Sequence, residues 1–231
     1  MPDKFITLNN VSKSYTRGGE TLKVLDQLQL SIARGDFVAL MGPSGSGKTT
    51  ILNLVGGLDS CDSGSVHVAD SEVSAMSRSE LPAWRSRHVG FVFQSFNLLP
   101  VLTALENVML PLQLTPLSAA ARKKQAAFAL DIVGLSDRAS HRPTQLSGGQ
   151  EQRVAIARAI ATDPAVIIAD EPTGDLDRSS ADEVLQILSR LNSELDKTIL
   201  MVTHDLVAAK KAKRLLELDK GLLVEDQQQE A

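Results

Sequence analysis

Cysteine is nearly absent from this chain, and aromatic residues are scarce. Cys61 is the only cysteine among 231 residues, so no disulfide can form within the chain, and a reducing compartment suits it. We expect Cys61 to be an ordinary loop or packing residue. Aromatic residues make up 3% of the sequence, with one tryptophan, Trp84, and one tyrosine, Tyr15. Nothing catalytic surrounds Trp84, which predicts a packing role for its indole ring.

Long apolar runs and an excess of positive charge are also missing. No segment approaches the roughly 18 to 20 apolar residues that a membrane-spanning helix needs, and residues 1–5 lack the basic and then apolar layout of a signal peptide. These absences predict a soluble, cytoplasmic protein. The formal net charge of −4 disfavours nucleic acid as a partner, because its binding relies on basic surfaces. The basic clusters at 122–124 and 210–214 are interpreted as solvated helix faces.

What the sequence does contain predicts a single α/β domain. A hydrophobic content of 43% over 231 residues is enough for one substantial core. Alternating apolar and polar residues at 5–8 and 28–32 predict an antiparallel edge layer, with a turn at 17–20. Apolar runs alternate with helical segments, which is typical of a mostly parallel central sheet. Its buried strands are predicted at 37–41, 89–93, 166–170 and 199–203.

A predominantly helical stretch at about 95–160 is interpreted as a subdomain inserted into the one domain of residues 1–231. A Thr-x-x-Glu capping box at 103–106 predicts one of its helices, and another is predicted to end at Gly134, a C-terminal cap. Outside this stretch, helices are predicted at 50–58 and 78–87, and a frayed polar tail at 226–231.

A glycine-rich loop follows the first buried strand and matches G-x-x-x-x-G-K-[ST], the phosphate-binding loop pattern. Its glycines let backbone amides approach phosphate oxygens, and the next helix directs its positive dipole end at the same charge. Lys48 is expected to contact the β- and γ-phosphates of ATP, and the Thr49 hydroxyl to bind Mg2+. The predicted nucleotide-binding residues here are Gly42, Pro43, Ser44, Gly45, Ser46, Gly47, Lys48, Thr49 and Thr50.

Two consecutive carboxylates, Asp170 and Glu171, end another apolar strand. A buried carboxylate is costly without a cationic partner, so Asp170 is predicted to bind Mg2+. Glu171 is placed to accept a proton from a water molecule that attacks the γ-phosphate, which makes it the predicted catalytic base. The alternative interpretation is that the pair caps a helix ahead of Pro172.

A second capping box lies about a hundred residues after the phosphate loop, where Ser147 and Gln150 enclose Gly148 and Gly149. The glycines leave the N-terminus of the following helix open, and this N-terminus is predicted to be a second anion-binding site. One nucleotide loop and two anion sites are best explained by a homodimer. In such a dimer, these four residues bind the γ-phosphate that the other copy's loop holds.

The order of these three features resembles the ATP-binding cassette (ABC) ATPases of ABC transporters, and the resemblance covers nearly the whole chain. It implies a P-loop NTPase core with an antiparallel β edge layer and an inserted α-helical subdomain. It also implies roles for four residues that each have an ordinary structural explanation when taken alone. Tyr15 stands where an aromatic ring stacks on adenine, Gln94 where a glutamine meets Mg2+ and the attacking water, Asp177 in a dimer-spanning turn, and His204 where a histidine contacts the γ-phosphate.

The segments 102–108 and 169–177 resemble the branch of the family that contains lipoprotein-releasing, macrolide-exporting and cell-division ATPases. Two departures weaken the assignment of a substrate. Residues 148–153 read Gly-Gly-Gln-Glu-Gln-Arg where that branch commonly has Gly-Gly-Glu-Gln-Gln-Arg, and Asp175 stands where Asn is usual. Neither departure removes a catalytic group.

We therefore predict a homodimeric, Mg2+-dependent ATPase subunit at the inner face of the cell membrane. It is expected to dock on a separate integral membrane permease subunit and to power export or membrane extraction of a lipid-linked or hydrophobic substrate. The alternative is a regulatory ATPase that transmits a signal through a membrane partner without transport. The net charge and the single cassette disfavour a third class, soluble cassettes that act on DNA or ribosomes. Residues 95–116 are predicted to form the groove that receives the partner's cytoplasmic helix.

Overall fold

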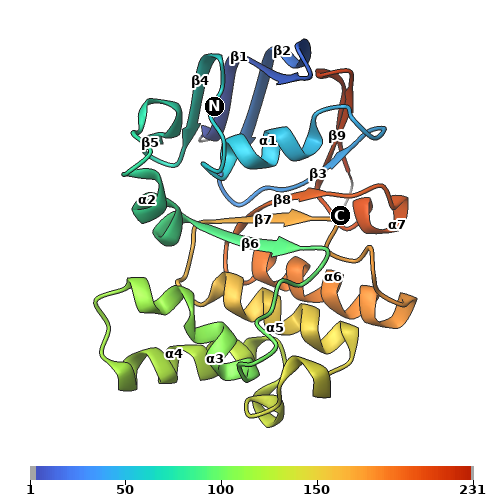
Figure 1. The fold of residues 1–231 in the computed structure, drawn as a ribbon. Coiled ribbons are helices and arrows are strands. Elements are labelled where there is room, and N and C mark those ends of the chain that lie inside the picture. Colours follow the sequence, from blue (N-terminus) through green and yellow to red (C-terminus); the bar gives the residue numbers. More distant parts are fainter. Residues whose placement is uncertain (1–3, 230–231) are drawn as a thin grey trace.

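The computed structural model describes residues 4–229, which form two β-sheets and a set of helices arranged in layers (Figure 1). The outer sheet is antiparallel and has the order β2-β1-β4-β5. The β1-β2 hairpin is interrupted by register shifts between Lys4 and Ser14, so the alternation at 5–8 and 28–32 marks only part of two long strands. The strands are β1 (Lys4–Arg17), β2 (Glu20–Ala33), β4 (Ser63–Val68) and β5 (Ser71–Glu72).

The central sheet has the order β10-β9-β3-β8-β7-β6 and is parallel from β9 to β6, with β10 antiparallel at one edge. This confirms the predicted α/β fold. The carboxyl ends of its parallel strands meet along one edge, which is where open α/β sheets bind ligands. The strands are β3 (Phe37–Met41), β6 (Val89–Phe93), β7 (Val166–Asp170), β8 (Thr198–Val202), β9 (Arg214–Asp219) and β10 (Leu222–Gln228).

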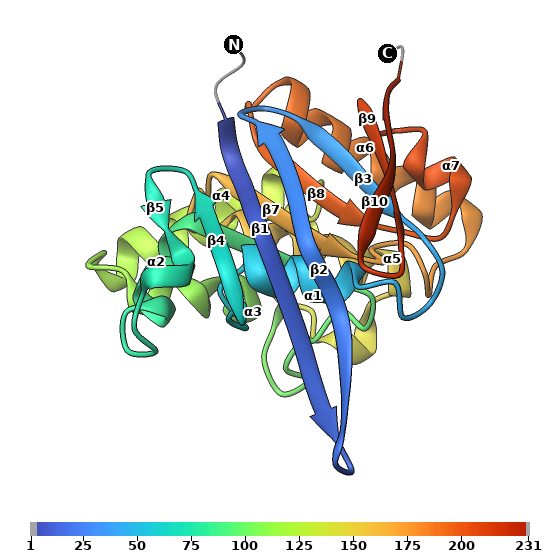
Figure 2. The ribbon, with the colours of Figure 1, turned by 90° about the horizontal axis from the view of Figure 1, so that it is seen from above.

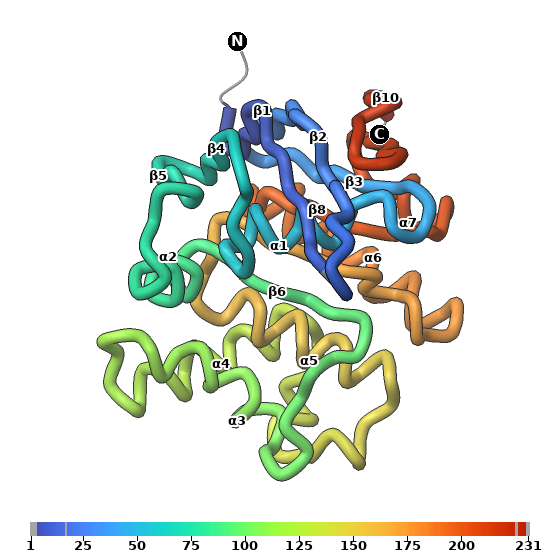
Figure 3. Tube along the Cα trace, turned by 45° about the horizontal axis from the view of Figure 1, so that its top comes forward, coloured from blue at the N-terminus to red at the C-terminus, as the bar shows by residue number. Residues whose placement is uncertain are grey.

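Side chains of the central strands alternate between two hydrophobic cores. In β3, Phe37 and Ala39 face the core that the helices α3 to α6 complete, whereas Val38 and Leu40 face the core beneath the antiparallel sheet. Helix α1 (Lys48–Val55) lies between the two sheets (Figures 1 and 3). The phosphate loop, which joins β3 to α1, is therefore held from both of its ends by buried elements.

Helices cover the opposite face of the central sheet, and Figure 2 shows them beyond the β1-β2 hairpin. Both predicted capping boxes are formed: Thr103 Oγ1 accepts a bond from the Glu106 amide, and Ser147 Oγ one from the Gln150 amide. Helix α4 ends just before Gly134, whose φ of +69° suits a C-terminal cap. The helices are α2 (Leu81–His88), α3 (Ala104–Met109), α4 (Ala119–Ile132), α5 (Gly148–Ile160), α6 (Arg178–Ser193) and α7 (Leu206–Ala209), with 3-10 turns at Val73–Ala75, Pro111–Leu114, Ser136–Arg138 and Pro143–Gln145.

The end of the chain corrects one prediction. The tail was expected to fray from Asp226, but β10 continues to Gln228, and Asp226 accepts a bond from Arg214 Nε at 2.6 Å. This ion pair lowers the pKa of Asp226. Polar residues on an edge strand lack the apolar pattern that marks a buried one, which is why the sequence did not show that the strand continues past residue 225. Residues 230–231 lie outside the described residues.

Smaller features follow the sequence closely. The helix expected at 50–58 begins earlier, at Lys48, and ends at Val55, while the one expected at 78–87 spans Leu81–His88. Trp84 is buried and stacks on His88, which confirms its packing role. Between residues 4 and 229, no helix combines the length and the apolar character that crossing a bilayer requires.

Candidate nucleotide-binding site

The phosphate loop owes its shape to glycines in the left-handed region. Gly42, Gly45 and Gly47 have φ angles of +144°, +79° and +105°, which side chains rarely adopt. A Cβ atom added to Gly42 would also lie 2.1 Å from the carbonyl oxygen of Leu218. No other residue type fits this position, because the loop passes close to the backbone of β9 at Leu218.

Polar groups converge on this loop. The Lys48 ammonium donates bonds to the carbonyl oxygens of Gly42 and Pro43, at 2.7 and 2.8 Å, which holds the charge against the loop. Among the described residues, the buried Ser46 hydroxyl has no hydrogen-bond partner. A fixed positive charge, loop amides and the start of α1 together fit the phosphates of a nucleotide.

The end of β7 carries the two carboxylates. Burial raises the pKa of Asp170, Glu171 raises it further, and Lys48 partly opposes the shift. A nearby cation would stabilise such a carboxylate. Glu171 has a strained φ of +48°, and its amide donates to the Val202 carbonyl oxygen at 2.9 Å. The backbone therefore turns sharply between the two acids and directs them differently.

Gln94 and His204 follow the ends of β6 and β8, the two strands on either side of β7. The Gln94 side-chain nitrogen donates to Asp175 at 2.6 Å, which leaves the amide oxygen for another partner. His204 Nδ1 lies 2.9 Å from Glu171 Oε1, and this hydrogen bond is the main reason why the pKa of His204 is raised above its usual value of 6.5. The predicted base and the predicted γ-phosphate sensor thus contact each other directly.

The Asp170 carboxylate, the Thr49 hydroxyl and the Gln94 amide oxygen are a donor set that fits Mg2+, which prefers oxygen ligands. No group of three or more His, Cys, Asp or Glu side chains in residues 4–229 could hold a metal ion on its own. Phosphate and water oxygens would have to complete the coordination, as is usual for Mg2+ bound with a nucleotide.

A cavity of about 640 Å³ unites most of these residues. A larger groove of about 810 Å³ lies between α4 and α6, but it lacks a phosphate loop and an acidic strand end, so the smaller cavity is the candidate site. The predicted residues that line it are Gly42, Ser44, Gly45, Gly47, Lys48, Thr49, Thr50, Gln94, Asp170, Glu171 and His204.

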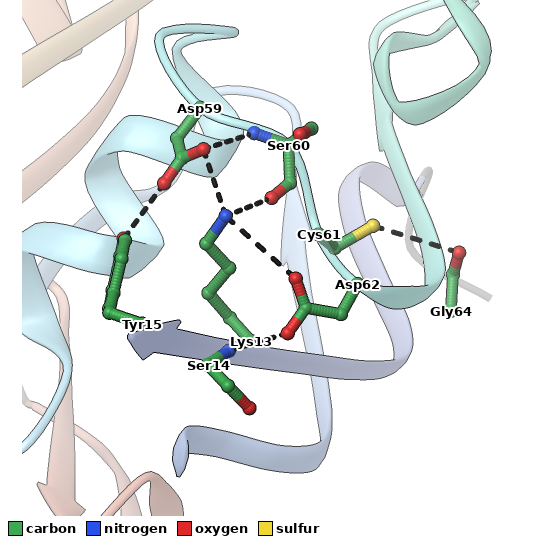
Figure 4. Close-up of polar contacts among 8 residues, drawn as sticks. All are labelled: Lys13, Ser14, Tyr15, Asp59, Ser60, Cys61, Asp62 and Gly64. Carbon is green, nitrogen blue, oxygen red and sulfur yellow. Dashed lines mark hydrogen bonds and ion pairs between the residues drawn. The ribbon is translucent and has the colours of Figure 1, made fainter. Parts of the chain in front are cut away.

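Tyr15 lies outside the residues lining this cavity, within a polar cluster that sequence reasoning missed (Figure 4). Its hydroxyl donates to Asp59 at 2.8 Å, and Lys13 Nζ lies 5.0 Å from the centre of its ring. Lys13 also bonds Asp59, at 2.9 Å, and the carbonyl oxygen of Ser60. The spacing of Lys13 and Tyr15 places them on one face of β1, but nothing in the sequence indicated Asp59. The cluster fixes the tyrosine ring in place.

The remaining predicted residues also lie outside the cavity. Ser147 caps α5, and a Cβ atom at Gly149 would approach the Ser180 hydroxyl to 2.6 Å, so this glycine permits close packing of α5 on α6. Asp177 caps α6 through bonds from Ser179 and Ser180 that lower its pKa. Within one chain, Ser147, Gly148, Gly149, Gln150 and Asp177 are not brought to the phosphate loop.

The parallel core, the phosphate loop and the acidic strand end define a P-loop nucleotide hydrolase. Residues 25–174 match the profile of the family described as ABC transporter. This chain therefore belongs to the ABC transporter family, and it is an ATPase of that family.

Relatives cover the chain almost completely. The uncharacterized ABC transporter ATP-binding protein YvrO of Bacillus subtilis is 47% identical over 222 residues, 96% of each chain. The lipoprotein-releasing system ATP-binding protein LolD of Idiomarina loihiensis is 43% identical, covering 98% of this chain and all of the relative. The macrolide export ATP-binding/permease protein MacB of Rhodopseudomonas palustris is 48% identical, but the chain spans only 34% of it.

Solved structures agree. A dimeric structure of the ATP-binding cassette MJ0796 in a post-hydrolysis state, bound to ADP and phosphate, superposes with a TM-score of 0.89 at 42% identity and covers 98% of this chain. The MJ0796 protein of Methanocaldococcus jannaschii is described as an ABC transporter ATP-binding protein. The predicted family, fold class and ATPase activity are confirmed.

Proposed function

We propose that this ATPase powers export or membrane extraction of a lipid-linked or hydrophobic substrate through a separate membrane subunit. The observation that carries the proposal is the match to the lipoprotein-releasing ATP-binding protein over that protein's whole length. The macrolide-export relative supports the same branch, and its name joins an ATP-binding part to a permease. The present chain corresponds to about a third of that relative.

The site residues receive the following roles in this proposal. Loop amides and Lys48 bind the phosphates, while Thr49, Gln94 and Asp170 would hold Mg2+. When bound, Mg2+ neutralises phosphate charge and orients the γ-phosphate. Glu171 accepts the proton of the attacking water. The 2.9 Å contact between His204 and Glu171 orients this carboxylate and places the imidazole to sense the γ-phosphate.

A second copy completes the site. The N-terminus of α5 presents an anion-binding surface at Ser147 to Gln150, yet these residues do not line the cavity of their own chain. In a dimer whose two copies face each other in opposite orientations, each copy would place this surface against the nucleotide that the other copy binds. The dimeric form of the structural relative bound to ADP and phosphate supports this arrangement.

The membrane partner is proposed to dock beside the loop that follows Gln94. A cavity of about 390 Å³ there is lined by Asn97, Pro111, Leu114 and Arg158, among others. Leu99 and Leu114 are exposed, at 47% and 73%. Leu105 lies within the predicted groove at 95–116 but packs against the hydrophobic core, so a charge at Leu105 would disturb folding rather than docking alone.

Docking and function are tested together by co-purification and reconstitution. The tagged chain is purified from detergent-solubilised membranes, and the protein that accompanies it is reconstituted with it in proteoliposomes. Leu99→Glu and Leu114→Glu should lose the partner while basal ATPase activity stays within about twofold, since charge disrupts an apolar docking surface. Leu195→Glu, a leucine of matched exposure at 48%, is the control and should keep the partner. ATP-dependent signalling without substrate movement would favour the regulatory alternative.

A further inference from the structure

Gln152 is a buried amide inside α5 that joins two segments of the nucleotide site. Its side chain is fully buried, at 0% exposure. Nε2 donates to the carbonyl oxygens of Phe93, at 3.1 Å, and Pro172, at 2.5 Å. Phe93 directly precedes Gln94, and Pro172 directly follows Glu171. One side chain therefore connects the backbones on which both proposed catalytic groups are carried.

Gln152 joins the two segments just beyond the point where β6 and β7 cease to pair. β6 and β7 pair up to the opposed residues Phe93 and Asp170, which end the ladder. Beyond that point the chain turns at Glu171, whose positive φ is a conformation that persists only when neighbouring contacts fix it. Pro172 has no amide hydrogen and can be anchored only through its carbonyl. The Gln152 amide supplies that anchor.

The energetics of this residue argue against a role in stability alone. Within the described residues, Gln152 Oε1 is buried without a hydrogen-bond partner. An unsatisfied buried acceptor lowers stability, and an apolar side chain of the same size would not carry one. The Gln152 amide thus combines an acceptor without a partner with two bonds from its nitrogen to the carbonyl oxygens of Phe93 and Pro172.

The loop on the far side of Gln94 is anchored to the same helix. The Arg158 guanidinium donates to the carbonyl oxygens of Phe96, at 2.7 Å, and Asn97. Both of these residues have positive φ, at +55° and +52°. The segment that carries Gln94 is therefore bonded to α5 on both sides of this residue: at Phe93 before it, and at Phe96 and Asn97 after it.

We infer that Gln152 is a positioning residue for ATP hydrolysis, which fixes Gln94 and Glu171 relative to each other and to the N-terminus of α5. The inference rests on the proposed roles of Gln94 and Glu171. Because α5 begins at Ser147, one rigid helix would carry the surface that meets the partner's nucleotide and would also align the hydrolytic groups of its own copy. Closure of the dimer would then act on the positions of Gln94 and Glu171 through the buried amide of Gln152.

The test compares two buried amides of equal chemistry. Gln152→Met keeps length and volume but removes both donors, and misplacement of catalytic groups on the order of 1 Å costs up to about 10²-fold. We expect kcat to fall roughly 10- to 100-fold, with KM for ATP within about threefold. Asn192→Leu is the control, because Asn192 is 4% exposed and its Nδ2 bonds the carbonyl oxygens of Gly35 and Lys197, both at 2.8 Å.

Both variants lose two buried hydrogen bonds, so both should show a lower Tm, but only Gln152→Met should lose kcat. Gln152→Asn, which keeps the donors on a side chain one methylene shorter, should reach only one carbonyl and fall between the parent and Gln152→Met. It replaces Gln152→Met if that variant does not fold. Equal kcat for the Gln152 variants and Asn192→Leu would overturn the inference. Glu171→Gln, assayed in parallel, separates the failures: a parental rate in that variant would refute the proposed role of Glu171, on which the inference rests, whereas a strongly reduced rate leaves the Gln152 comparison as the test.

Discussion

The two anion-binding regions of this molecule differ in how complete they are. The phosphate loop shares one cavity with Gln94, Glu171 and His204, which come from three other parts of the same chain. The N-terminus of α5 lies outside that cavity, and Ser147 is engaged in capping its own helix. We interpret the first region as self-contained for nucleotide binding and the second as a surface that acts on another copy. Variants of each region should therefore fail in different ways.

The largest effect is expected from Glu171→Gln, which removes the proton acceptor and leaves the phosphate contacts in place. Hydrolysis should slow by roughly 10²- to 10⁴-fold, while ATP affinity stays within about twofold. Phosphate release and titration with a fluorescent ATP analogue measure the two quantities. Glu194→Gln, an exposed carboxylate paired with Arg190, is the control and should hydrolyse ATP at the parental rate. If Glu171→Gln also did so, the general-base role would be wrong.

A smaller effect is expected at Tyr15. It tests whether this residue belongs to the region that binds the nucleotide within one chain. Aromatic stacking contributes on the order of 1 kcal/mol, so Tyr15→Ala should weaken ATP binding several-fold. Stacking needs only the ring, and on that ground alone Tyr15→Phe would change little. Because the hydroxyl bonds Asp59 at 2.8 Å, Tyr15→Phe should instead show a small loss, still clearly below that of Tyr15→Ala. Equal losses for the two variants, measured with the same nucleotide titration, would contradict stacking.

The smallest effect concerns protonation of His204. Its pKa is raised by Glu171, so the charged imidazole is favoured in the folded state. The resulting stabilisation is fully present below the usual value of 6.5 and is lost as the pH rises through the raised pKa. The imidazole is largely exposed, so the gain in stability is small. NMR titration should show this pKa moving back toward 6.5 in Glu171→Gln, and identical curves would disprove the contact.

The residues of the phosphate-loop region were easier to predict from the sequence than the residues that hold them in place. Contiguous motifs such as 42–49 and 170–171 are recognised by their residue types at fixed spacing. Their positions, at the ends of buried strands, could therefore be predicted. Gln152 and Asp59 were not foreseen, because each acts through partners 20 to 59 and 44 to 46 residues away. No local pattern distinguishes such a side chain from any other polar residue before the fold is known.

Fold predictions failed for a related reason. The strand at Leu222–Gln228 is polar at its end, and its stability depends on Arg214, which lies on the neighbouring strand. Residues 95–116 mix apolar and loop-forming types and are predicted to form a docking groove, yet Leu105 in this stretch packs against the core of the helical layer. Periodicity indicates which face of an element is buried, but not which neighbour buries it.

The central claim, that α5 of one copy completes the site of another, is tested most directly by nucleotide-dependent dimerisation. Size-exclusion chromatography with light scattering is run on Glu171→Gln in Mg-ATP and in ADP, alone and combined with Ser147→Arg. Bound ATP stabilises a closed dimer by mass action, so Glu171→Gln should dimerise in ATP only, and Lys48→Ala should neither bind ATP nor dimerise.

Adding Ser147→Arg to Glu171→Gln should preserve ATP binding and abolish the dimer. Ser118→Arg is the matched control, because the Ser118 hydroxyl accepts a bond from the amide three residues on in α4, as the Ser147 hydroxyl does in α5. In the Glu171→Gln background it should leave the dimer intact. An ATP-dependent dimer that persists with Ser147→Arg would contradict the composite site.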